Sequence, residues 1–408
     1  MRFQQNENGK GLMFQRQNIR KAFLILFFLT CSSSIHLVAQ SNDSILISGL
    51  LKDITAAQVS ASGEFYPGSF PSYRESAGFP HNRQSDNNIF FTAISIFTLR
   101  NLLPQLGEED KKTAMRIIEN AQPAFPYYQN KEGLPFYNFW PTGKGILPHT
   151  LFVRHFNNVL GMGEDADDAV MALMATGAAD SICRLLKQRM LEVSNLSKKR
   201  INSTFPRYRN LPAYSTYLGL HMPPDFDLCV HCNILYFLFS RKLPMVKQDT
   251  ATIRLLSQIL KEREYMSSPV YLSPYYDRRP VLMYHLARLM GSFRIPELEL
   301  YKAQLVGDIQ EELKISTSLM DRIILSTSLI RLGELPAAIP ISSIQLFEKS
   351  GTAHFIFFQA RAAFWYPHLL KKIFLHSSYL HYNFYCPVYT KVLLLEYLLL
   401  RKNLPLRH

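Results

Sequence analysis

Six stretches of the chain share one pattern of polar and apolar positions. Each begins with acidic or polar residues and continues as a mostly apolar run, and most end with Arg, a leucine-type residue and then Pro or Gly. Apolar residues on nearly every side are typical of helices that are buried all around. We therefore predict six related inner helices, at residues 85–104, 164–188, 224–244, 277–291, 321–333 and 386–405.

The ends of these stretches carry the residue types that helix termini require. An aspartate at the start can cap the first turn and complement the helix dipole, and the closing Arg can meet the carbonyl end. Pro or Gly then terminates the helix, although stretch 164–188 lacks such a stop in this pattern. The predicted capping residues are Asp86, Asp165, Asp225 and Asp321.

The segments between the inner helices predict a second, outer layer. Residues 108–122, 249–264 and 295–313 are amphipathic, with charge on one face. The inner starts lie roughly 45 to 80 residues apart, which accommodates one inner helix, one outer helix and their loops. We therefore predict an all-α fold, an (α/α)6 toroid of six helical hairpins, with an open solenoid as the alternative. Because alternating β-branched runs are scarce, we expect no large sheet.

Two stretches rich in proline and aromatic residues predict ordered loops. They cover residues 63–74 and 127–150. Loops of such a barrel gather at one mouth, where binding residues commonly lie.

The first 40 residues have the order of a secretory signal. Arg16, Arg20 and Lys21 precede an apolar run at 22–29, and small residues follow. The apolar run is too short to cross a bilayer comfortably. We expect cleavage and export to the periplasm or the exterior, with lipid attachment at Cys31 as the weaker alternative. The predicted organisation is a signal peptide at 1–40, a lead-in at 41–62 and a single toroid domain at 63–408.

Charge and cysteine content narrow the partners. The chain carries a net charge of +13, and loss of residues 1–40 removes five basic residues and one acid, leaving about +9. The densest basic run, Lys187 to Arg209, surrounds a polar loop that is either a solvated connection or a contact for an anionic membrane or glycan. We expect no nucleic-acid partner, and oligomeric state stays open. Cys229 and Cys232 could form a disulfide or redox pair, although their context is helical.

An acidic cluster opens the second inner stretch. Asp165, Asp167 and Asp168 reproduce the DxDD element of class II terpenoid cyclases. The hairpin repeat resembles the α/α toroid shared by these cyclases and the β subunits of protein prenyltransferases, and residues 129–136 resemble their Gln-Gly-Trp repeat, with Phe136 in place of Trp. The resemblance suggests an exported bacterial branch of this superfamily. It implies that Asp167 is a general acid that protonates an alkene or epoxide, with Asp165 and Asp168 as its catalytic neighbours.

The same cluster has a purely structural interpretation. With Asp165 as N-cap, Asp168 falls at the third helical position, close to a capping-box spacing, and all three carboxylates can stabilise the first turn without any reaction. Crowded carboxylates also favour sharing a proton, which would keep Asp167 protonated, whereas the helix dipole favours ionised aspartate. Burial of Asp167 decides between these effects.

The prenyltransferase side of the resemblance implies a zinc site. Its ligands, an Asp-x-Cys pair and a distant His, would correspond to Asp227, Cys229 and His285. These ligand types suit Zn²⁺. The flanking sequence departs from that family, so we expect a buried thiol and a buried histidine, with no metal and no cofactor.

Three functions follow as hypotheses. The first is a toroid that binds a hydrophobic, isoprenoid-like ligand or catalyses acid-initiated cyclisation or isomerisation; the second is a carbohydrate-active glycosidase or lyase, with Tyr128, Tyr137 and Trp140 stacking on sugars; the third is a non-enzymatic scaffold. An apolar cavity around Asp167 would favour the first, an open polar groove the second and a plugged barrel the third. The candidate ligand-binding residues are Asp86, Asn87, Tyr137, Trp140, Asp227, His231, Asn233, Tyr276 and Tyr389.

Overall fold

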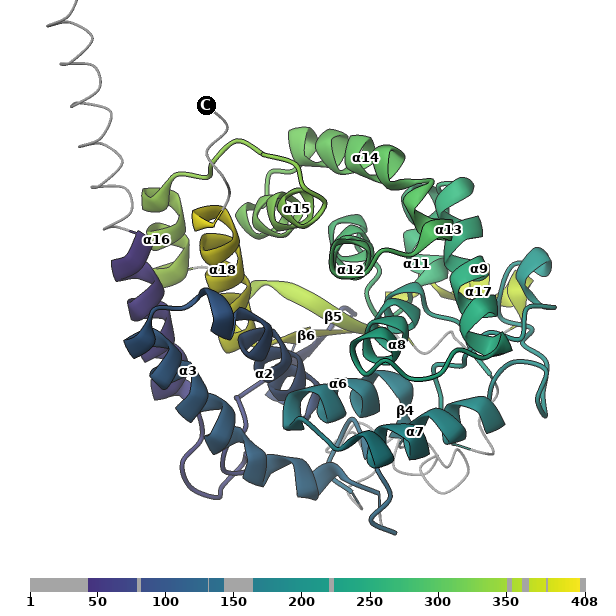
Figure 1. The fold of residues 1–408 in the computed structure, drawn as a ribbon, viewed down its shortest axis with the longest axis horizontal. Helices are drawn as coiled ribbons and strands as arrows, with labels where there is room; N and C mark the ends of the chain where they lie inside the picture. Colours follow the sequence, from purple (N-terminus) through teal and green to yellow (C-terminus); the bar gives the residue numbers. More distant parts are fainter. Residues whose placement is uncertain are drawn as a thin grey trace, which may run out of the picture.

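The six predicted inner helices form a closed ring. The computed structural model describes residues 43–78, 82–130, 132–142, 164–219, 224–350, 354–361, 367–378 and 381–403. Each inner helix contacts the next along the chain, and the last contacts the first (Figure 1). The ring consists of α2 (Phe90–Leu102), α6 (Ala166–Thr176), α8 (Leu228–Ser240), α12 (Arg279–Ser292), α15 (Leu319–Arg331) and α18 (Pro387–Lys402).

An outer layer of amphipathic helices surrounds the ring (Figure 1). These helices bury one face only; α3, for example, buries Ala114, Ile117, Ile118 and Ala121. The prediction of an all-α toroid with inner and outer layers is therefore confirmed. The layer contains α3 (Glu108–Ala121), α7 (Asp180–Glu192), α9 (Lys247–Lys261), α14 (Lys302–Ile315), α16 (Ile341–Ser350) and a helix over residues 43–57.

The helix over 43–57 joins the last inner helix through ion pairs. Asp43 pairs with Arg401 at 2.6 Å and Asp53 with Lys391 at 2.5 Å, while Lys391 also reaches Glu348 of α16. The predicted lead-in thus contributes its described part to the outer layer. The predicted signal peptide at 1–40 lies outside the described residues. Among the described helices, none combines the length and the apolar character that a membrane span requires.

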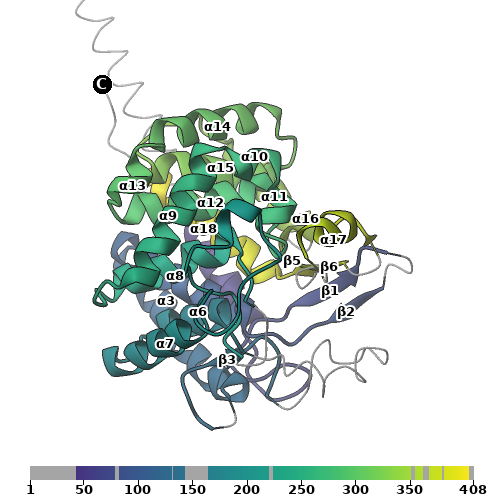
Figure 2. The same cartoon turned by 90° about the vertical axis from the view of Figure 1, so that its right-hand side faces the viewer.

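A small sheet covers the end of the ring where the inner helices begin (Figure 2). All its strand pairs are antiparallel and their order is β2-β1-β6-β5, so β1 pairs with a strand from the far end of the chain, Tyr73 opposite Tyr385. These short strands were not predicted from the sequence, although they do not amount to a large sheet. Their bounds are β1 (Tyr73–Ser76), β2 (Arg83–Ser85), β5 (Ile356–Arg361) and β6 (His381–Tyr385).

Short elements connect the layers. A two-stranded pair, β3 and β4, brings Tyr137 opposite Asp165. The predicted loop 127–150 is therefore not wholly loop, and its residues 143–150 lie outside the described part. The short elements are η1 (Leu103–Gln105), η2 (Gln122–Tyr128), β3 (Tyr137–Asn138), β4 (Glu164–Asp165), η3 (Pro206–Tyr208), α10 (Glu264–Ser267), α11 (Pro269–Leu272), α13 (Pro296–Glu299) and α17 (His368–Phe374).

The prediction of one helix over 164–188 is wrong. Gly177 ends α6 in the left-handed region, at φ 69°, and a new helix, α7, begins at Asp180 in the outer layer. Glycine adopts that conformation without the steric cost that other residues meet. The stretch thus holds an inner helix, its glycine stop and the following outer helix.

Three of the four predicted caps are also wrong. Asp165 caps α6, its Oδ1 accepting from the backbone N–H of Asp168 at 2.7 Å, but Asp86 and Asp225 cap no helix because burial and other partners hold them. Asp227 caps α8 instead. In α15 the cap is Ser318, and Asp321 lies in the first turn.

The closing arginines act between helices rather than on their own carbonyl ends. Arg100 of α2 donates to the carbonyl of Ala175 at 2.6 Å, and Arg241, just after α8, donates to that of Leu173 at 3.3 Å. Both carbonyls belong to the end of α6. Arginines from the two neighbouring inner helices therefore satisfy the carbonyl end of α6.

Candidate functional site

Asp167 lies at the start of α6, inside the ring. Its carboxyl group is buried, and it connects three inner-helix starts. Tyr276, just before α12, donates its hydroxyl to Oδ2, and Asn233 of α8 donates its amide to Oδ1 at 2.6 Å. Burial raises the pKa of Asp167, while these two hydrogen bonds and the charge of Arg288 oppose the rise. Three predicted site residues therefore form one hydrogen-bonded group.

Asp165 and Asp168 crowd the same helix start. Burial and then the neighbouring charge of Asp167 raise the pKa of Asp165 to about 7. Burial and then Asp165 raise the pKa of Asp168 well above its ordinary value, and neither carboxyl oxygen of Asp168 has a hydrogen-bond donor among the described residues. Only Asp165 acts as a cap, so capping does not account for the other two carboxyl groups.

Asp227 adds a fourth buried carboxyl group next to this cluster. It accepts from the backbone N–H groups of Cys229 and Val230, at 2.8 and 3.1 Å, and from the hydroxyl of Ser273 at 2.6 Å. Burial nevertheless raises its pKa to about 7, with a contribution from Asp167. The N-terminal end of the ring therefore holds several carboxyl groups that ionise with difficulty.

A buried arginine supports the Asp167 group from behind. Arg288 of α12 donates to the side-chain oxygen of Asn233, which orients the Asn233 amide toward Asp167. Its guanidinium also lies over the rings of Phe97 and Tyr284, each at 5.4 Å. The prediction that Arg288 is a closing arginine whose side chain meets helix carbonyl groups is wrong. An arginine three residues after His285, inside an otherwise apolar helix, was the signal of a buried polar group.

Aromatic rings from the sheet fill the mouth of the ring above Asp167. Phe358 of β5 packs on Tyr276 and Phe90, with ring centroids 5.4 and 5.3 Å apart. Phe357 lies against Tyr276 on the other side and reaches Tyr389 of α18 at 4.8 Å. The predicted shared mouth thus exists, but β5 occupies it. The aromatic run before residue 359 was the missed signal for this strand.

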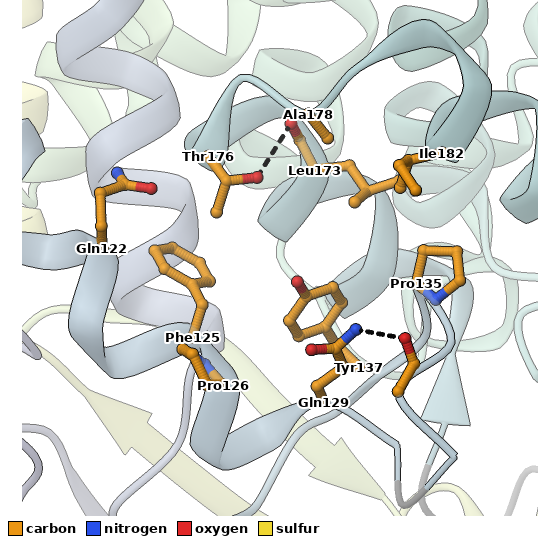
Figure 3. Close-up of a pocket in the computed structure, with 11 residues that line it drawn as sticks. Gln122, Phe125, Pro126, Gln129, Pro135, Tyr137, Leu173, Thr176, Ala178 and Ile182 are labelled. Carbon is orange, nitrogen blue, oxygen red and sulfur yellow. Dashed lines mark hydrogen bonds between the residues drawn. The ribbon is translucent and has the colours of Figure 1, made fainter.

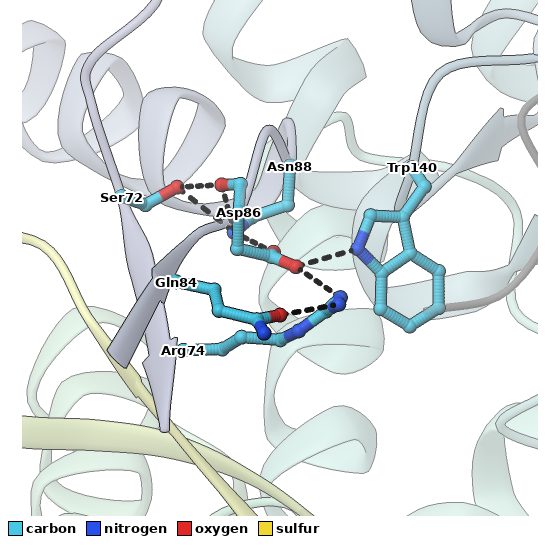
Figure 4. A network of polar contacts seen from close by, with 6 residues as sticks. All are labelled: Ser72, Arg74, Gln84, Asp86, Asn88 and Trp140. Atoms are coloured by element: carbon cyan, nitrogen blue, oxygen red, sulfur yellow. Dashed lines mark hydrogen bonds and ion pairs between the residues drawn. The ribbon is translucent and has the colours of Figure 1, made fainter. Parts of the chain in front are cut away.

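Asp86 and Trp140 belong to a separate network that joins the sheet to the ring (Figure 4), and Asn87 makes contacts of its own. Asp86 pairs with Arg74 of β1 at 3.0 Å and accepts from the Trp140 indole N–H at 2.9 Å. Asn87 donates to the Glu64 carbonyl and accepts from the Tyr128 hydroxyl. These predicted ligand-binding residues therefore make contacts that hold the fold together, away from Asp167.

None of the remaining predicted residues has a hydrogen bond to the Asp167 carboxyl group in the part of the chain that the structure describes. His231 contacts the Tyr214 carbonyl at 2.8 Å and the Phe226 ring, and burial lowers its pKa to about 4. Tyr389 is buried, and its hydroxyl has no hydrogen-bond partner among the described residues. Tyr137 lines a surface pocket of about 300 Å³ between η2 and the end of α6 (Figure 3). Since Tyr128 and Tyr137 are buried, their predicted role in sugar stacking is not supported.

In the described part of the chain, no group of three or more His, Cys, Asp or Glu side chains is arranged so that it could hold a metal ion, and this includes the residues that resemble zinc ligands. The His285 ring bonds to the Val281 carbonyl at 2.8 Å. Burial, and then Arg288, lowers its pKa well below the ordinary value. Cys229 and Cys232 are buried and are not joined by a disulfide, and burial raises the pKa of both thiols.

Comparisons with known proteins add a structural likeness. No family model matches the chain, and no curated protein matches its sequence. Among solved structures, the chain is similar to a variant of the type II terpene cyclase MstE from Scytonema, solved in complex with its substrate geranylgeranyl dihydroxybenzoate. The identity is 12%, the TM-score is 0.47, and the match covers 89% of this chain and 99% of the other. A likeness of this extent bears on neither the substrate nor the reaction of this chain.

Proposed function

We propose that this protein is an acid catalyst that uses Asp167 to protonate a carbon–carbon double bond of an apolar, isoprenoid-like substrate. One observation carries the proposal: a buried carboxyl group with a raised pKa lies among aromatic rings and is held by Tyr276 and Asn233. A raised pKa is typical of groups tuned to deliver a proton near neutral pH. The DxDD resemblance supports the same role for Asp167.

The surroundings of Asp167 suit both states of such an acid. Burial raises the pKa of Asp167 and so favours the protonated carboxyl group before a substrate binds. Once the proton has left, Tyr276 and Asn233 stabilise the carboxylate, with Arg288 behind Asn233. The ring faces of Phe90, Phe357 and Phe358 attract positive charge through their quadrupoles, as in cation–π contacts.

The reaction balances without a cofactor. The O–H bond of Asp167 breaks and a C–H bond forms, which consumes one π bond and leaves a cation on the adjacent carbon. Attack by a second double bond closes a ring and moves the cation to another carbon, which then loses a proton to water and forms a new double bond. If the first cation instead loses a proton directly, the result is isomerisation. Asp167 regains its proton from solvent, and the raised pKa values of Asp165, Asp168 and Asp227 favour a protonated neighbourhood.

The proposal requires Phe357 and Phe358 to leave the mouth when substrate enters. A second candidate, a non-enzymatic toroid, rests on the same two residues, since they pack there as core side chains. In that case the acidic cluster is a structural feature and no substrate displaces β5.

Turnover in D₂O tests the proposal. Purified protein is incubated with a panel of polyprenyl alkenes and epoxides, with glycans as a separate panel, and products are analysed by mass spectrometry. Protonation by Asp167 places one solvent deuteron in each product, and Asp167→Asn is expected to lower the rate at least about 100-fold. Asp180→Asn is the matched control, because Asp180 is an exposed carboxylate in the first turn of α7. Equal turnover by wild type and Asp167→Asn overturns the proposal.

Phe358→Ala separates the two candidates. If β5 must leave the mouth, removing this ring should increase the rate or broaden the range of accepted substrates. If the rings are permanent core, the variant loses stability by about 3 kcal/mol and no substrate is converted by it or by wild type.

Export of the protein is a separate proposal that rests on residues 1–40. It predicts that full-length chain expressed in a bacterium appears outside the cytoplasm in a shortened form. Mass spectrometry of the N-terminus after fractionation tests this, and an intact cytoplasmic chain would contradict it.

A further inference from the structure

The short helix α17 presents apolar side chains to solvent. Leu369 is 73% exposed, Ile373 is 67% exposed and Leu370 is 44% exposed. Single exposed apolar residues are ordinary on protein surfaces, but a group within five positions of one helix indicates a contact surface. We call these three residues the α17 patch.

The opposite side of α17 is fixed to the toroid. Lys371 is buried, lies 3.7 Å from Asp225 and has its ammonium group 4.8 Å from the centre of the Tyr271 ring. The Tyr271 hydroxyl contacts Nδ1 of His368 at 2.6 Å. The patch therefore points outward because Lys371 and His368 anchor the other face. Figure 2 shows α17 beside β5 and β6, at the end of the ring that carries the sheet.

A loop that contains Lys198, Arg200 and Asn202 adjoins the α17 patch, and we call it the basic loop. The backbone N–H of His368 donates to the carbonyl of Asn202 at 3.0 Å, and Lys372 lies over the ring of Phe205 at 5.6 Å. The exposed residues Lys198 and Arg200 precede Asn202 by four and two positions, so Arg200 lies within about 7 Å of the contact, measured along the chain.

Acidic residues are missing from both segments. The sequence from 193 to 224 contains no Asp or Glu, and neither does the sequence from 349 to 395. In a chain with 32 acidic residues, this leaves the apolar patch beside cations whose own segments supply no compensating carboxylate. The surface is therefore complementary to an anionic partner that also accepts apolar side chains.

We propose that the α17 patch and the basic loop dock on an anionic lipid bilayer. Apolar side chains can enter the boundary between headgroups and acyl chains while neighbouring lysines and arginines attract the anionic headgroups. A bilayer fits this combination because a single surface offers acyl chains to the apolar side chains and anionic headgroups to the cations. The inference stands apart from the chemistry of Asp167, but the two agree, since the docked end of the ring is the end with the mouth.

Vesicle flotation tests the proposal. Purified protein is mixed with phosphatidylcholine vesicles that contain or lack phosphatidylglycerol, at low and high salt. Binding is expected on the anionic vesicles alone and should weaken at high salt, because salt screens exposed charges. The triple variant Leu369→Ser, Leu370→Ser, Ile373→Ser should lower the bound fraction at least about tenfold, and Lys198→Gln with Arg200→Gln should lower it about tenfold as well.

Matched controls separate this result from general loss of apolar surface. Leu300→Ser with Ile315→Ser removes side chains that are 78% and 67% exposed on another part of the surface, and should bind as wild type. Asp167→Asn should also bind as wild type, which keeps this test independent of the proposed activity. Absence of binding to anionic vesicles, or equal binding by the triple variant, overturns the proposal. A dimer that the triple variant dissociates in light scattering would likewise overturn it, in favour of a second copy of the chain.

Discussion

Buried charge at the end of the inner ring where the helices finish differs from the acidic cluster at the start of α6. At the end where the inner helices finish, charged groups meet carbonyls or opposite charges: Arg100 and Arg241 donate to carbonyls of α6, and Arg331 pairs with Glu396. At the start of α6, Asp167 and Asp168 are buried without a directly bonded cation among the residues that the structure describes, whereas Asp86 and Asp225 at neighbouring helix starts pair with Arg74 and Lys371.

This difference separates structure from chemistry. Carbonyl ends and a paired carboxylate need nothing beyond stability to explain them. Buried carboxyl groups without cations lower stability, and groups that do so are common where a protein performs a function. The comparison predicts opposite responses: neutralising Glu396 should destabilise the fold, and neutralising Asp168 should stabilise it.

The largest effect is expected for Glu396→Gln. Glu396 is fully buried and accepts from Nε of Arg331 at 2.9 Å and from the Tyr284 hydroxyl at 2.7 Å. Loss of its charge leaves Arg331 without compensation, so the free energy of unfolding should fall by about 4 kcal/mol. Denaturant unfolding measures this. Glu311 forms an exposed pair with Lys314, so Glu311→Gln should change the free energy of unfolding by less than about 1 kcal/mol. Equal losses of stability in the Glu396→Gln and Glu311→Gln variants would contradict the prediction.

The next effect tests the packing of the same end. A Cβ on Gly291 of α12 would lie 2.4 Å from the carbonyl oxygen of Arg331 in α15. The backbone cannot move away there without separating two inner helices, so Gly291→Ala should lower the free energy of unfolding by about 3 kcal/mol. Gly307→Ala is the control: no atom lies within 4 Å of its added Cβ, and the change should stabilise α14 by about 1 kcal/mol. Thermal unfolding of both variants would reveal opposite shifts, and a stable Gly291→Ala protein would show that the two helices can separate.

The inner helices could be predicted because their signals are local. Apolar runs, Asp165 as a cap and the closing arginines all lie within one stretch of chain. The sheet was missed because its strands are short and pair across the whole sequence, as Tyr73 does with Tyr385. No local pattern specifies that partner.

The candidate site was predictable in part for the same reason. The DxDD element identified Asp167, and the polar helix starts included Asn233 and Tyr276. Which of the polar helix starts contact one another depends on the orientation of each chain segment. That orientation depends in turn on partners that lie far away in the sequence. Asp86 lies elsewhere because Arg74 and Trp140 hold it, and Arg288 joins the site through the interior face of α12.

A pH-dependent effect follows at the other end of the ring. The pKa of Asp227 is raised to about 7, so the folded protein binds a proton there that the unfolded chain loses near pH 4. This contribution to stability is complete below about pH 4 and is lost as pH rises through about 7, at up to about 1.4 kcal/mol per pH unit. Asp227→Asn retains an oxygen that can cap α8 but does not titrate. Its free energy of unfolding should therefore depend less on pH between 5 and 7 than that of wild type, while Asp180→Asn should keep the wild-type slope.

The smallest effect is the one with the opposite sign. Burial and then Asp165 raise the pKa of Asp168 well above its ordinary value, and neither oxygen of Asp168 accepts a hydrogen bond from the residues that the structure describes. At pH 8 folding must therefore either protonate this carboxyl group or bury its charge, and both are unfavourable relative to the ionised, solvated group in the unfolded chain. Asp168→Asn has the same shape and meets neither cost, so it should stabilise the protein by about 1 kcal/mol at pH 8. The gain should vanish near pH 4, where the aspartate is protonated in the folded protein without cost. A loss of stability at pH 8 would mean that this carboxylate has a stabilising partner, and the contrast between Glu396 and the acidic cluster at the start of α6 would fail at the residue where it is sharpest.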